Sequence, residues 1–419
     1  MNHVTNKTLV ILGAVVVLAL IAALTLHSGN QPQTESQAAA QPILPDLRDH
    51  LNDIASVSFT GAGEKPIATF EKGASGWSVK ERGGYPADTA KLREFLLKLS
   101  DATVLEAKTS SDKRYAELGV DDVKSADAKG VLVALSGLSK PTQLIVGIAN
   151  SRGAGTYVRR AGEAQSWLAK GNISIDKNAS NWLDKSLADI AATRIKEVTL
   201  TSPEGKVLHV AKEQAADASF KVSDVPKGRE LSSEFAANGL GAALAGLRFD
   251  DVLPNKEAEP PADGKVNKAH YVTFEGLAID AIGWKKDEKA YARFTVNFDA
   301  AAAEPAIVAQ QAKAKADWES QQKDQAAKPA DTAKPADATP PLAVSDPAKD
   351  KQQRLDALNK EVAALHQRFE GWTYVLPTFR YDSLSKGMDE LLKPLEAKKD
   401  DKAKPAAPKS IKEALPGNH

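Results

Sequence analysis

Hydrophobic and polar positions alternate along the chain in several patterns, and the first is an uninterrupted apolar run. It extends from Leu9 to Leu26, and Lys7 stands just before it. At 1.5 Å per residue, this run predicts a helix about 27 Å long, close to the thickness of a bilayer's hydrocarbon core. Residues 27–42, which follow it, contain neither Lys nor Arg. The positive-inside rule therefore places the short N-terminus in the cytoplasm and the rest of the chain outside.

A cleaved signal peptide is the alternative interpretation of this run. Ala38, Ala39 and Ala40 are small residues of the kind found at cleavage sites, but they stand well beyond the run. The run is also longer than the apolar region of an ordinary signal peptide. We therefore expect an uncleaved signal anchor over 1–27, followed by a polar tether over 28–42.

Short apolar/polar alternations typical of strands then occur in two similar series. The first begins near Ile54 and the second near Ile195, and glycine-containing turns separate the predicted strands in both. Each series leads into an amphipathic stretch with apolar residues at helical spacing. The residues concerned are Leu92, Phe95, Leu96 and Leu99 in the first series, and Leu240, Leu244 and Leu247 in the second.

The later parts of the two series also correspond. Tyr157 and Arg159 match Tyr291 and Arg293, and farther on Trp167 matches Trp372. The wider spacing of the tryptophans indicates an insertion in the second copy. We predict an α+β fold in which a transmembrane helix precedes a duplicated unit of antiparallel sheet with segregated helices. The expected repeats are 43–192 and 193–395, with a helical insertion at 300–368 and a closing helix near Leu183 and Leu187 or Leu391 and Leu392.

The insertion is rich in alanine and proline and ends in a second helical pattern. Its apolar positions are spaced alternately three and four apart, as in a coiled-coil seam: Leu355, Leu358, Val362, Leu365 and Phe369. Two interpretations are open. The two helices form a hairpin that contacts a partner, or the second helix lies on its own domain. The charged, proline-containing tail at 396–419 predicts disorder.

The amino-acid composition limits the kinds of chemistry that the chain can carry out. Lys+Arg and Asp+Glu are equal at 55 each and there is no cysteine, so disulfides, thiolate nucleophiles and cysteine metal sites are excluded, and a polyanion binder is not expected. No zinc-helix histidine pair, phosphate-binding loop or nucleophile elbow is present. We expect no enzyme activity, no cofactor, no metal and no nucleic acid. On a strand, Tyr157 and Arg159 share a face, as do Tyr291 and Arg293, so each Arg can lie beside its Tyr. The pair is either a structural repeat or a contact surface.

Several short motifs resemble a known family. They are Gly76-Trp77-Ser78-Val79, Tyr85-Pro86-Ala87-Asp88, Tyr115-Ala116-Glu117-Leu118-Gly119, Thr156-Tyr157-Val158-Arg159 and Trp182-Leu183-Asp184. Together with the N-terminal run, they resemble the domain of unknown function 4340 family. These are exported proteins found alongside gliding-motility-type ABC transporter auxiliary components. The resemblance covers about 45–300 and 370–395 and implies no catalytic residues.

The expected function is a non-enzymatic accessory of an ABC-2-type export system. Leu9 to Leu26 would hold it in the bacterial inner membrane as a single-pass protein, with the bulk of the chain periplasmic. Its partners would be an ABC permease and auxiliary subunits. A free-standing envelope scaffold, for example one that contacts the cell wall, is the alternative from the same residues, and an envelope hydrolase is a third.

Overall fold

The structure is a computed structural model that describes residues 41–151, 153, 155–326 and 339–394. The predicted span Leu9 to Leu26, the predicted tether up to residue 40 and the tail 396–419 lie outside these residues. Within the described part of the chain, no helix is long and apolar enough to cross a membrane. The chain divides into two units, Met1–Asp184 and Lys185–His419, with a boundary earlier than the predicted 192/193.

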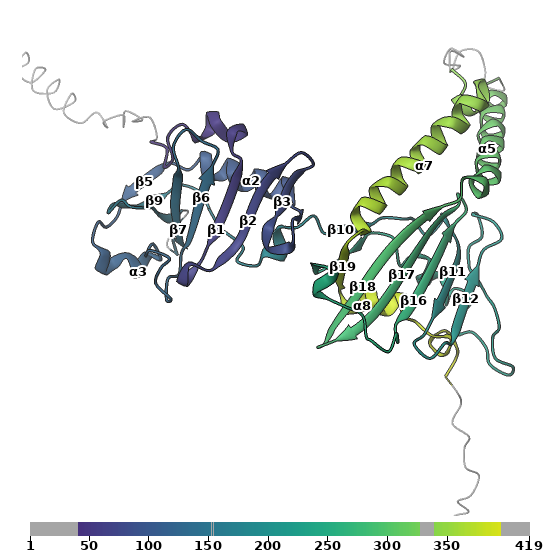
Figure 1. The fold of residues 1–419 in the computed structure, drawn as a ribbon. Coiled ribbons are helices and arrows are strands. Elements are labelled where there is room, and N and C mark those ends of the chain that lie inside the picture. The colour runs from purple at the N-terminus through teal and green to yellow at the C-terminus, as the bar shows by residue number, and fades with distance from the viewer. Residues whose placement is uncertain (1–40, 152, 154, 327–338, 395–419) are drawn as a thin grey trace, which may run out of the picture. The chain divides into compact units, whose positions relative to one another are not determined.

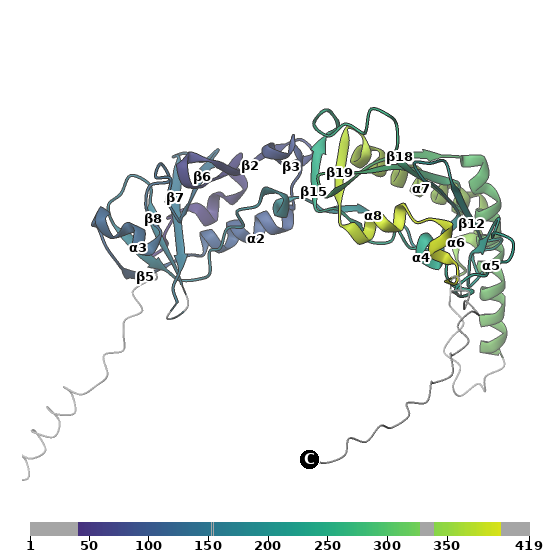
Figure 2. The ribbon, with the colours of Figure 1, turned by 90° about the horizontal axis from the view of Figure 1, so that it is seen from below.

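The first unit is a nine-stranded antiparallel sheet with one long helix against it (Figures 1 and 2). Its strands are β1 (Ser56–Thr60), β2 (Pro66–Gly73), β3 (Gly76–Val79), β4 (Tyr85–Pro86), β5 (Val104–Ala107), β6 (Val131–Ser136), β7 (Thr142–Ala149), β8 (Thr156–Arg160) and β9 (Ser166–Ala169). Its helices are α2 (Thr89–Ser100) and α3 (Tyr115–Leu118), with 3₁₀ turns η1 (Leu47–Asp53), η2 (Ala62–Glu64), η3 (Lys80–Arg82), η4 (Asp112–Arg114) and η5 (Ala179–Trp182).

Helix α2 forms as its sequence predicts. The Asp88 side chain accepts a hydrogen bond from the backbone N–H of Lys91 at 2.9 Å and so caps the first turn. The predicted apolar residues Leu92, Phe95, Leu96 and Leu99 are all buried. Phe95 meets Phe59 and Trp182 at ring-centroid distances of 5.0 and 6.0 Å, so the helix is fixed by an aromatic core beneath the sheet.

The second unit is an eight-stranded antiparallel sheet, with a separate two-stranded sheet of β10 and β14. Its strands are β10 (Ser186–Ala188), β11 (Ile195–Thr201), β12 (Val207–Ala211), β13 (Lys221–Val222), β14 (Leu247–Arg248), β15 (Asp251–Pro254), β16 (Asn267–Thr273), β17 (Leu277–Lys286), β18 (Lys289–Phe298) and β19 (Trp372–Leu376). Its helices are α4 (Asn238–Gly241), α5 (Ala300–Ala326), α6 (Leu342–Ser345), α7 (Pro347–Phe369) and α8 (Thr378–Leu384), with η6 (Asn255–Glu257) and η7 (Met388–Leu391).

The two large sheets have the same strand order. The first reads β4-β3-β2-β1-β6-β7-β8-β9-β5 and the second reads β13-β12-β11-β16-β17-β18-β19-β15. With β4 set aside, every strand of one sheet has a counterpart at the same place in the other. The predicted α+β class with antiparallel sheets is therefore confirmed, and the two predicted series of strands take one common topology.

Each unit is also closed by the same backbone contacts. In the first, Ala87 bridges Leu183, and the N–H of Asp88 donates to Trp182 O at 2.8 Å. In the second, Leu231 bridges Leu392, and the N–H of Ser232 donates to Leu391 O at 2.8 Å. The end of each unit thus returns to the segment that precedes its first long helix or helical turn.

Three predicted helices are shorter than expected. The stretch with Leu240, Leu244 and Leu247 forms only one turn, α4, because glycines interrupt it and Gly241 sits against Phe220, where a Cβ would come within 2.4 Å of the ring. The predicted closing helices are single 3₁₀ turns, η5 and η7, and Leu187 belongs to strand β10.

The insertion forms two long helices that extend beyond the end of the second sheet (Figure 1). Ala303 and Ile307 at the start of α5 are buried, so this helix begins inside its own unit. The first turns of α7 meet α5 through an ion pair between Lys351 and Glu304, and Gln311 donates to Asp350 at 2.9 Å. The two helices are therefore joined near the sheet.

Candidate functional site

A groove in the second unit arises where β18 extends beyond its pairing with the neighbouring strand, β19. β18 pairs with β17 along its whole length, but with β19 only from Ala290 to Ala292. Beyond Ala292, no described strand pairs with this side of β18. The insertion stands between β18 and β19, and α7 packs beside β18 before Gly371, at φ 84°, turns the chain into β19. A groove of about 530 Å³ lies in the space that remains.

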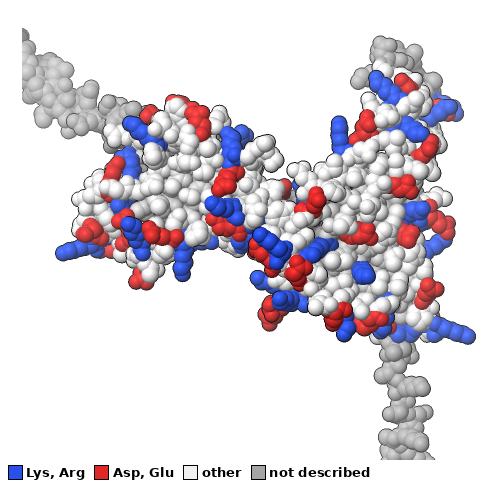
Figure 3. Space-filling view, viewed as in Figure 1, with Lys and Arg blue, Asp and Glu red and all other residues white. Residues whose placement is uncertain are grey.

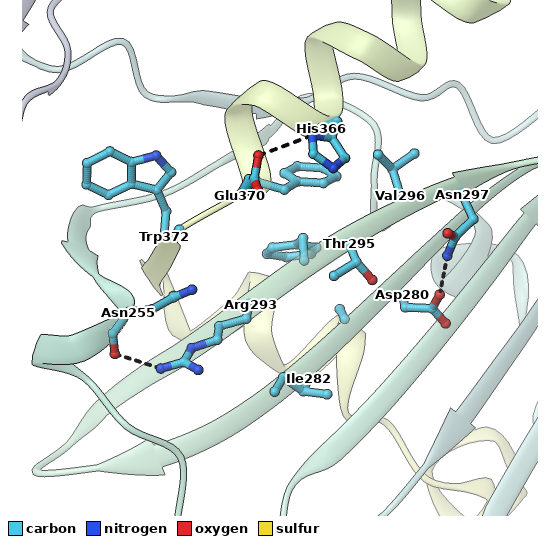
Figure 4. A pocket seen from close by; sticks show the side chains of 14 residues that line it. Asn255, Asp280, Ile282, Arg293, Thr295, Val296, Asn297, His366, Glu370 and Trp372 are labelled. Carbon is cyan, nitrogen blue, oxygen red and sulfur yellow. Dashed lines mark hydrogen bonds and ion pairs between the residues drawn. The ribbon is translucent and has the colours of Figure 1, made fainter.

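Side chains from the sheet and from the helix line this groove on opposite sides (Figure 4). The labelled residues are Asp280 and Ile282 of β17, Arg293, Thr295, Val296 and Asn297 of β18, Asn255 of η6, His366 and Glu370 at the end of α7, and Trp372 of β19. The lining combines an indole and aliphatic groups with hydrogen-bonding groups.

The charged groups of the groove are held by neighbours. Asp280 Oδ1 lies 2.7 Å from His270 Nδ1, and His366 Nδ1 lies 3.4 Å from a carboxylate oxygen of Glu370. Arg293 Nε donates to Thr373 Oγ1 at 2.8 Å, and its Nη2 donates to the carbonyl of Asn255 at 2.8 Å. The carboxylates keep free lone pairs, so the groove favours a ligand that donates hydrogen bonds and carries an apolar group.

The predicted helix residues divide between two environments. Leu355, Leu358 and Val362 are half-buried, while Leu365 and Phe369 are buried. Phe369 packs on Phe294 of β18 with ring centroids 5.4 Å apart. The interpretation in which the helix lies on its own domain therefore describes the end of α7, and the helix-pair interpretation describes its start.

A bidentate ion pair fixes the middle of α7 to the sheet. Arg194, just before β11, donates from Nη1 and Nη2 to Glu361 at 2.8 and 3.0 Å. Its Nε also lies 3.5 Å from Glu275. The hydrogen bonds to Glu361 raise the pKa of Arg194 above its ordinary value. Sequence analysis missed this pair because its partners are far apart in the chain and no pattern connects them.

The first Tyr/Arg pair lies on β8, but the two side chains have different partners. Arg159 is only 3% exposed and donates to Val120 O at 2.9 Å and to Asp122 Oδ1 at 2.6 Å. Its guanidinium lies 4.5 Å from the ring centroid of Tyr115, whereas the Tyr157 hydroxyl donates to Asn150. Arg159 thus holds the segment after α3 against the sheet, and its aromatic neighbour, Tyr115, is the first residue of α3.

The second pair, on β18, is arranged in a related way. Tyr291 stacks on Trp284 of β17 with centroids 5.7 Å apart, and the Arg293 guanidinium lies 5.6 Å from the same indole. Arg293 also donates to Ala258 O at 2.9 Å. Both arginines therefore bind carbonyls of the segment that follows the last strand of the sheet order, β5 or β15. Arg293 differs in that it also borders the groove.

The sequence did not predict a series of hydrogen-bonded polar side chains on the outer strands of the second unit. His209 Nε2 lies 3.0 Å from Glu197 Oε1, and His209 Nδ1 lies 2.9 Å from Ser223 Oγ. A carboxylate accepts from Nε2–H, so Nδ1 can accept from the Ser223 hydroxyl. Alternation along β11 and β12 could have put Glu197 and His209 on one face, but Ser223 comes just after the short strand β13, and the strand pattern at Phe220 and Val222 does not show that this strand pairs with β12.

The two units therefore share one sheet architecture, and the groove beside β18 belongs to the second unit. Residues 77–266 match the model of DUF4340, a domain of unknown function. This match confirms the resemblance seen in the sequence, over a narrower range. The matched range includes strands of both units and ends before β16, so every residue that lines the groove except Asn255 lies outside it. No curated protein and no solved structure matches the chain.

Proposed function

We propose that the protein is a non-enzymatic, membrane-anchored accessory protein of the bacterial cell envelope that works with an ABC-2-type export system. The apolar run Leu9 to Leu26 would hold it in the inner membrane, with both units in the periplasm. The DUF4340 match supports the resemblance on which the transporter association rests. The partners would be the permease and auxiliary subunits.

The groove beside β18 is the observation that favours a protein-binding role. It exists only because the insertion separates β18 from β19, and the first unit, whose β8 pairs with β9 from Thr156 to Arg159, has no such opening at that place. An insertion that opens a sheet and adds two long helices creates contact surface. Polar groups that share a groove with a partly exposed apolar group, here Thr295 and Asn297 with Trp372, are typical of sites that bind protein segments.

Co-purification tests the proposal. The full chain would be tagged, extracted from its native membranes in mild detergent and captured, and the recovered proteins identified by mass spectrometry. We expect a permease and its ATPase to be enriched over an untagged control. A free-standing scaffold would bring down cell-wall material without either subunit, and that result would contradict the transporter association.

Matched variants then assign the contact. Thr295→Arg places a long side chain in the groove from an exposed strand position, and we expect it to lower the recovery of the permease about tenfold. Val207→Arg changes a residue that is also β-branched, exposed and on a strand of the same unit, but outside the groove lining. Equal recovery from both variants would remove the groove from the proposal.

The hydrogen-bonded series Ser223–His209–Glu197 favours a hydrolase as the second candidate function. A serine nucleophile needs a base, which His209 provides, and also donors for the oxyanion. The N–H of Ser223 is already donated to His209 O at 3.0 Å, so the serine lacks its nearest oxyanion donor. Labelling of the full chain by a fluorophosphonate, abolished by Ser223→Ala, would establish the hydrolase and overturn the non-enzymatic assignment.

A further inference from the structure

A second groove, in the first unit, combines cations with apolar groups. It has a volume of about 330 Å³ and lies between η1, α2 and the β2–β3 hairpin. Its residues are Arg48, Leu51, Asn52, Lys72, Trp77, Thr89, Leu92, Arg93, Leu96 and Leu97. Three of them are cations and none is acidic. The groove is therefore suited to a ligand that has an anionic head and an apolar body.

The sequence builds this groove from three local elements. On α2, Thr89, Arg93 and Leu97 are spaced four apart and lie on one helix face. Lys72 and Trp77 are a cross-strand pair of the β2–β3 hairpin, and the Lys72 ammonium lies 6.0 Å from the centre of the indole. Each element contributes both a cation and an apolar group; in the hairpin these are Lys72 and Trp77.

The cations differ in how much of their charge is already satisfied. Arg48 pairs with Asp101 at 3.0 Å, and Lys72 donates to the carbonyl of Asn52 at 2.9 Å. Among the residues that the structure describes, Arg93 has no ion-pair or hydrogen-bond partner. Next to it, Leu97 is 45% exposed, whereas the other leucines of this helix are buried. A free guanidinium beside an exposed leucine is the strongest indication of a ligand.

We propose that this groove binds an anionic phospholipid of the membrane in which the chain is anchored. Leucine, an indole and several basic side chains are the composition of surfaces that lie on anionic bilayers. Arg48 follows the predicted span by 22 residues of sequence (Leu26 to Arg48), which reach at most about 75 Å when extended, so the first unit can return to the bilayer. The proposal rests on the proposed anchor.

The first experiment places the full chain in nanodiscs. The discs contain phosphatidylcholine alone or with phosphatidylglycerol, and one lipid at a time carries bromine on its acyl chains. The Trp77 emission is obtained as the difference between the wild type and Trp77→Phe. We expect brominated phosphatidylglycerol to quench Trp77 and Arg93→Gln to remove that quenching. Equal quenching by brominated phosphatidylcholine in discs without phosphatidylglycerol, or no quenching, would overturn the proposal.

Lys98→Gln is the matched control for Arg93→Gln. It also removes one cation from an exposed position of α2, but Lys98 pairs with Glu94 and lies outside the groove. We expect Lys98→Gln to behave as the wild type, and thermal melting verifies that both variants fold. If both variants lost the quenching equally, the effect would be general charge and the groove would not be the site.

The second experiment separates the groove from the anchor. The full chain in amphipol is titrated with dihexanoyl-phosphatidylglycerol, with Trp77 emission as the readout. Arg93→Gln should weaken the apparent affinity about fivefold. Carbonate washing of membranes tests the anchor separately, because it releases proteins that lack a membrane span. If the wash released the chain and the chain still bound the lipid, the groove would remain a lipid site and the proposed anchor would be wrong. Equal saturation by inorganic phosphate would make it a free-anion site, and saturation by a Glu/Leu peptide alone would make it a protein site; either overturns the proposal.

Discussion

Tyr271 and Tyr374 are both buried in the second unit, but their hydroxyl groups differ in what they contact. The Tyr374 hydroxyl donates to the carbonyl of Arg368 at the end of α7. Among the residues that the structure describes, the buried Tyr271 hydroxyl has no hydrogen-bond partner, and burial raises the pKa of this side chain well above its ordinary value. A buried polar group without a partner loses its hydrogen bonds to water on folding and gains no hydrogen bond within the protein.

Tyr271→Phe should therefore stabilise the second unit. Removing the unpaired hydroxyl is expected to raise the free energy of unfolding by about 1 kcal/mol, while Tyr374→Phe should lower it by about 1 kcal/mol. Urea titration of the full chain, followed by the transition of the second unit, measures both. A loss of stability in Tyr271→Phe would show that its hydroxyl has a partner, such as a buried water molecule.

At this scale the sequence predicted which residues would face the same side, but not what they would touch. The i, i+2 spacing placed Arg159 beside Tyr157 along β8, yet Tyr115 supplies the ring under the guanidinium. Arg293 likewise reaches carbonyls of residues 255–258. Such partners depend on how a loop folds back over the sheet, and single-strand periodicity contains no information on that.

Among the helices and strands, the junction of α5 and α7 depends on one carboxylate. Asp350, in the first turn of α7, accepts from Arg354 Nε at 2.7 Å and from Gln311 of α5 at 2.9 Å. The hydrogen bond from Arg354 is the main reason that the pKa of Asp350 lies below its ordinary value, although burial opposes it. A lowered pKa means that the folded state prefers the ionised carboxyl.

This junction should weaken in acid. The stabilisation by Asp350 is complete above the ordinary carboxyl pKa, near 4, and is lost as the pH falls through the lower pKa of the folded state. At pH 7, Asp350→Asn should speed hydrogen exchange in residues 347–354 about fivefold. The exposed Asp356→Asn is the control. If the effect of Asp350→Asn remained undiminished at pH 3, ionisation would not be the cause.

Strands were predicted well at this scale, and the groove was not. Alternation marked β11, β16, β17 and β18 because each is half-buried in the way that a two-residue period records. The groove depends on where β19 meets β18, and that register joins Ala290 to Leu376 across the whole insertion. Local patterns fix an element's type, whereas a contact this distant is set by packing.

At the scale of the molecule, the two units share one topology, and each closes on itself. The N–H of Asp184 donates to Pro86 O at 3.1 Å, and the N–H of Lys393 donates to Glu230 O at 2.9 Å. The last residues of each unit thus bind that unit's own chain. The order of predicted strands anticipated this repetition, but the predicted boundary at 192/193 falls after β10 and would separate this strand from its partner β14 in the second unit.

The position of the boundary gives a direct test of how the units fold. A fragment of residues 185–394 keeps Leu187 and Ile190, which are 0% and 1% exposed, and the hydrogen bond from Ile190 N–H to Leu244 O at 3.1 Å. A fragment of 193–394 loses both side chains and the β10–β14 pairing. Because burial of one such side chain contributes about 1.5–3 kcal/mol, loss of the two should make the shorter fragment less stable by about 3–6 kcal/mol.

Thermal melting of both fragments, alongside 41–184, measures the difference. We expect 41–184 and 185–394 to melt cooperatively, since each contains a complete sheet and its closing bridge, Ala87 to Leu183 or Leu231 to Leu392. The fragment 193–394 should melt many degrees lower, or lack a cooperative transition. Equal midpoints for 185–394 and 193–394 would contradict the boundary after Asp184, because β10 would then contribute nothing to the second core.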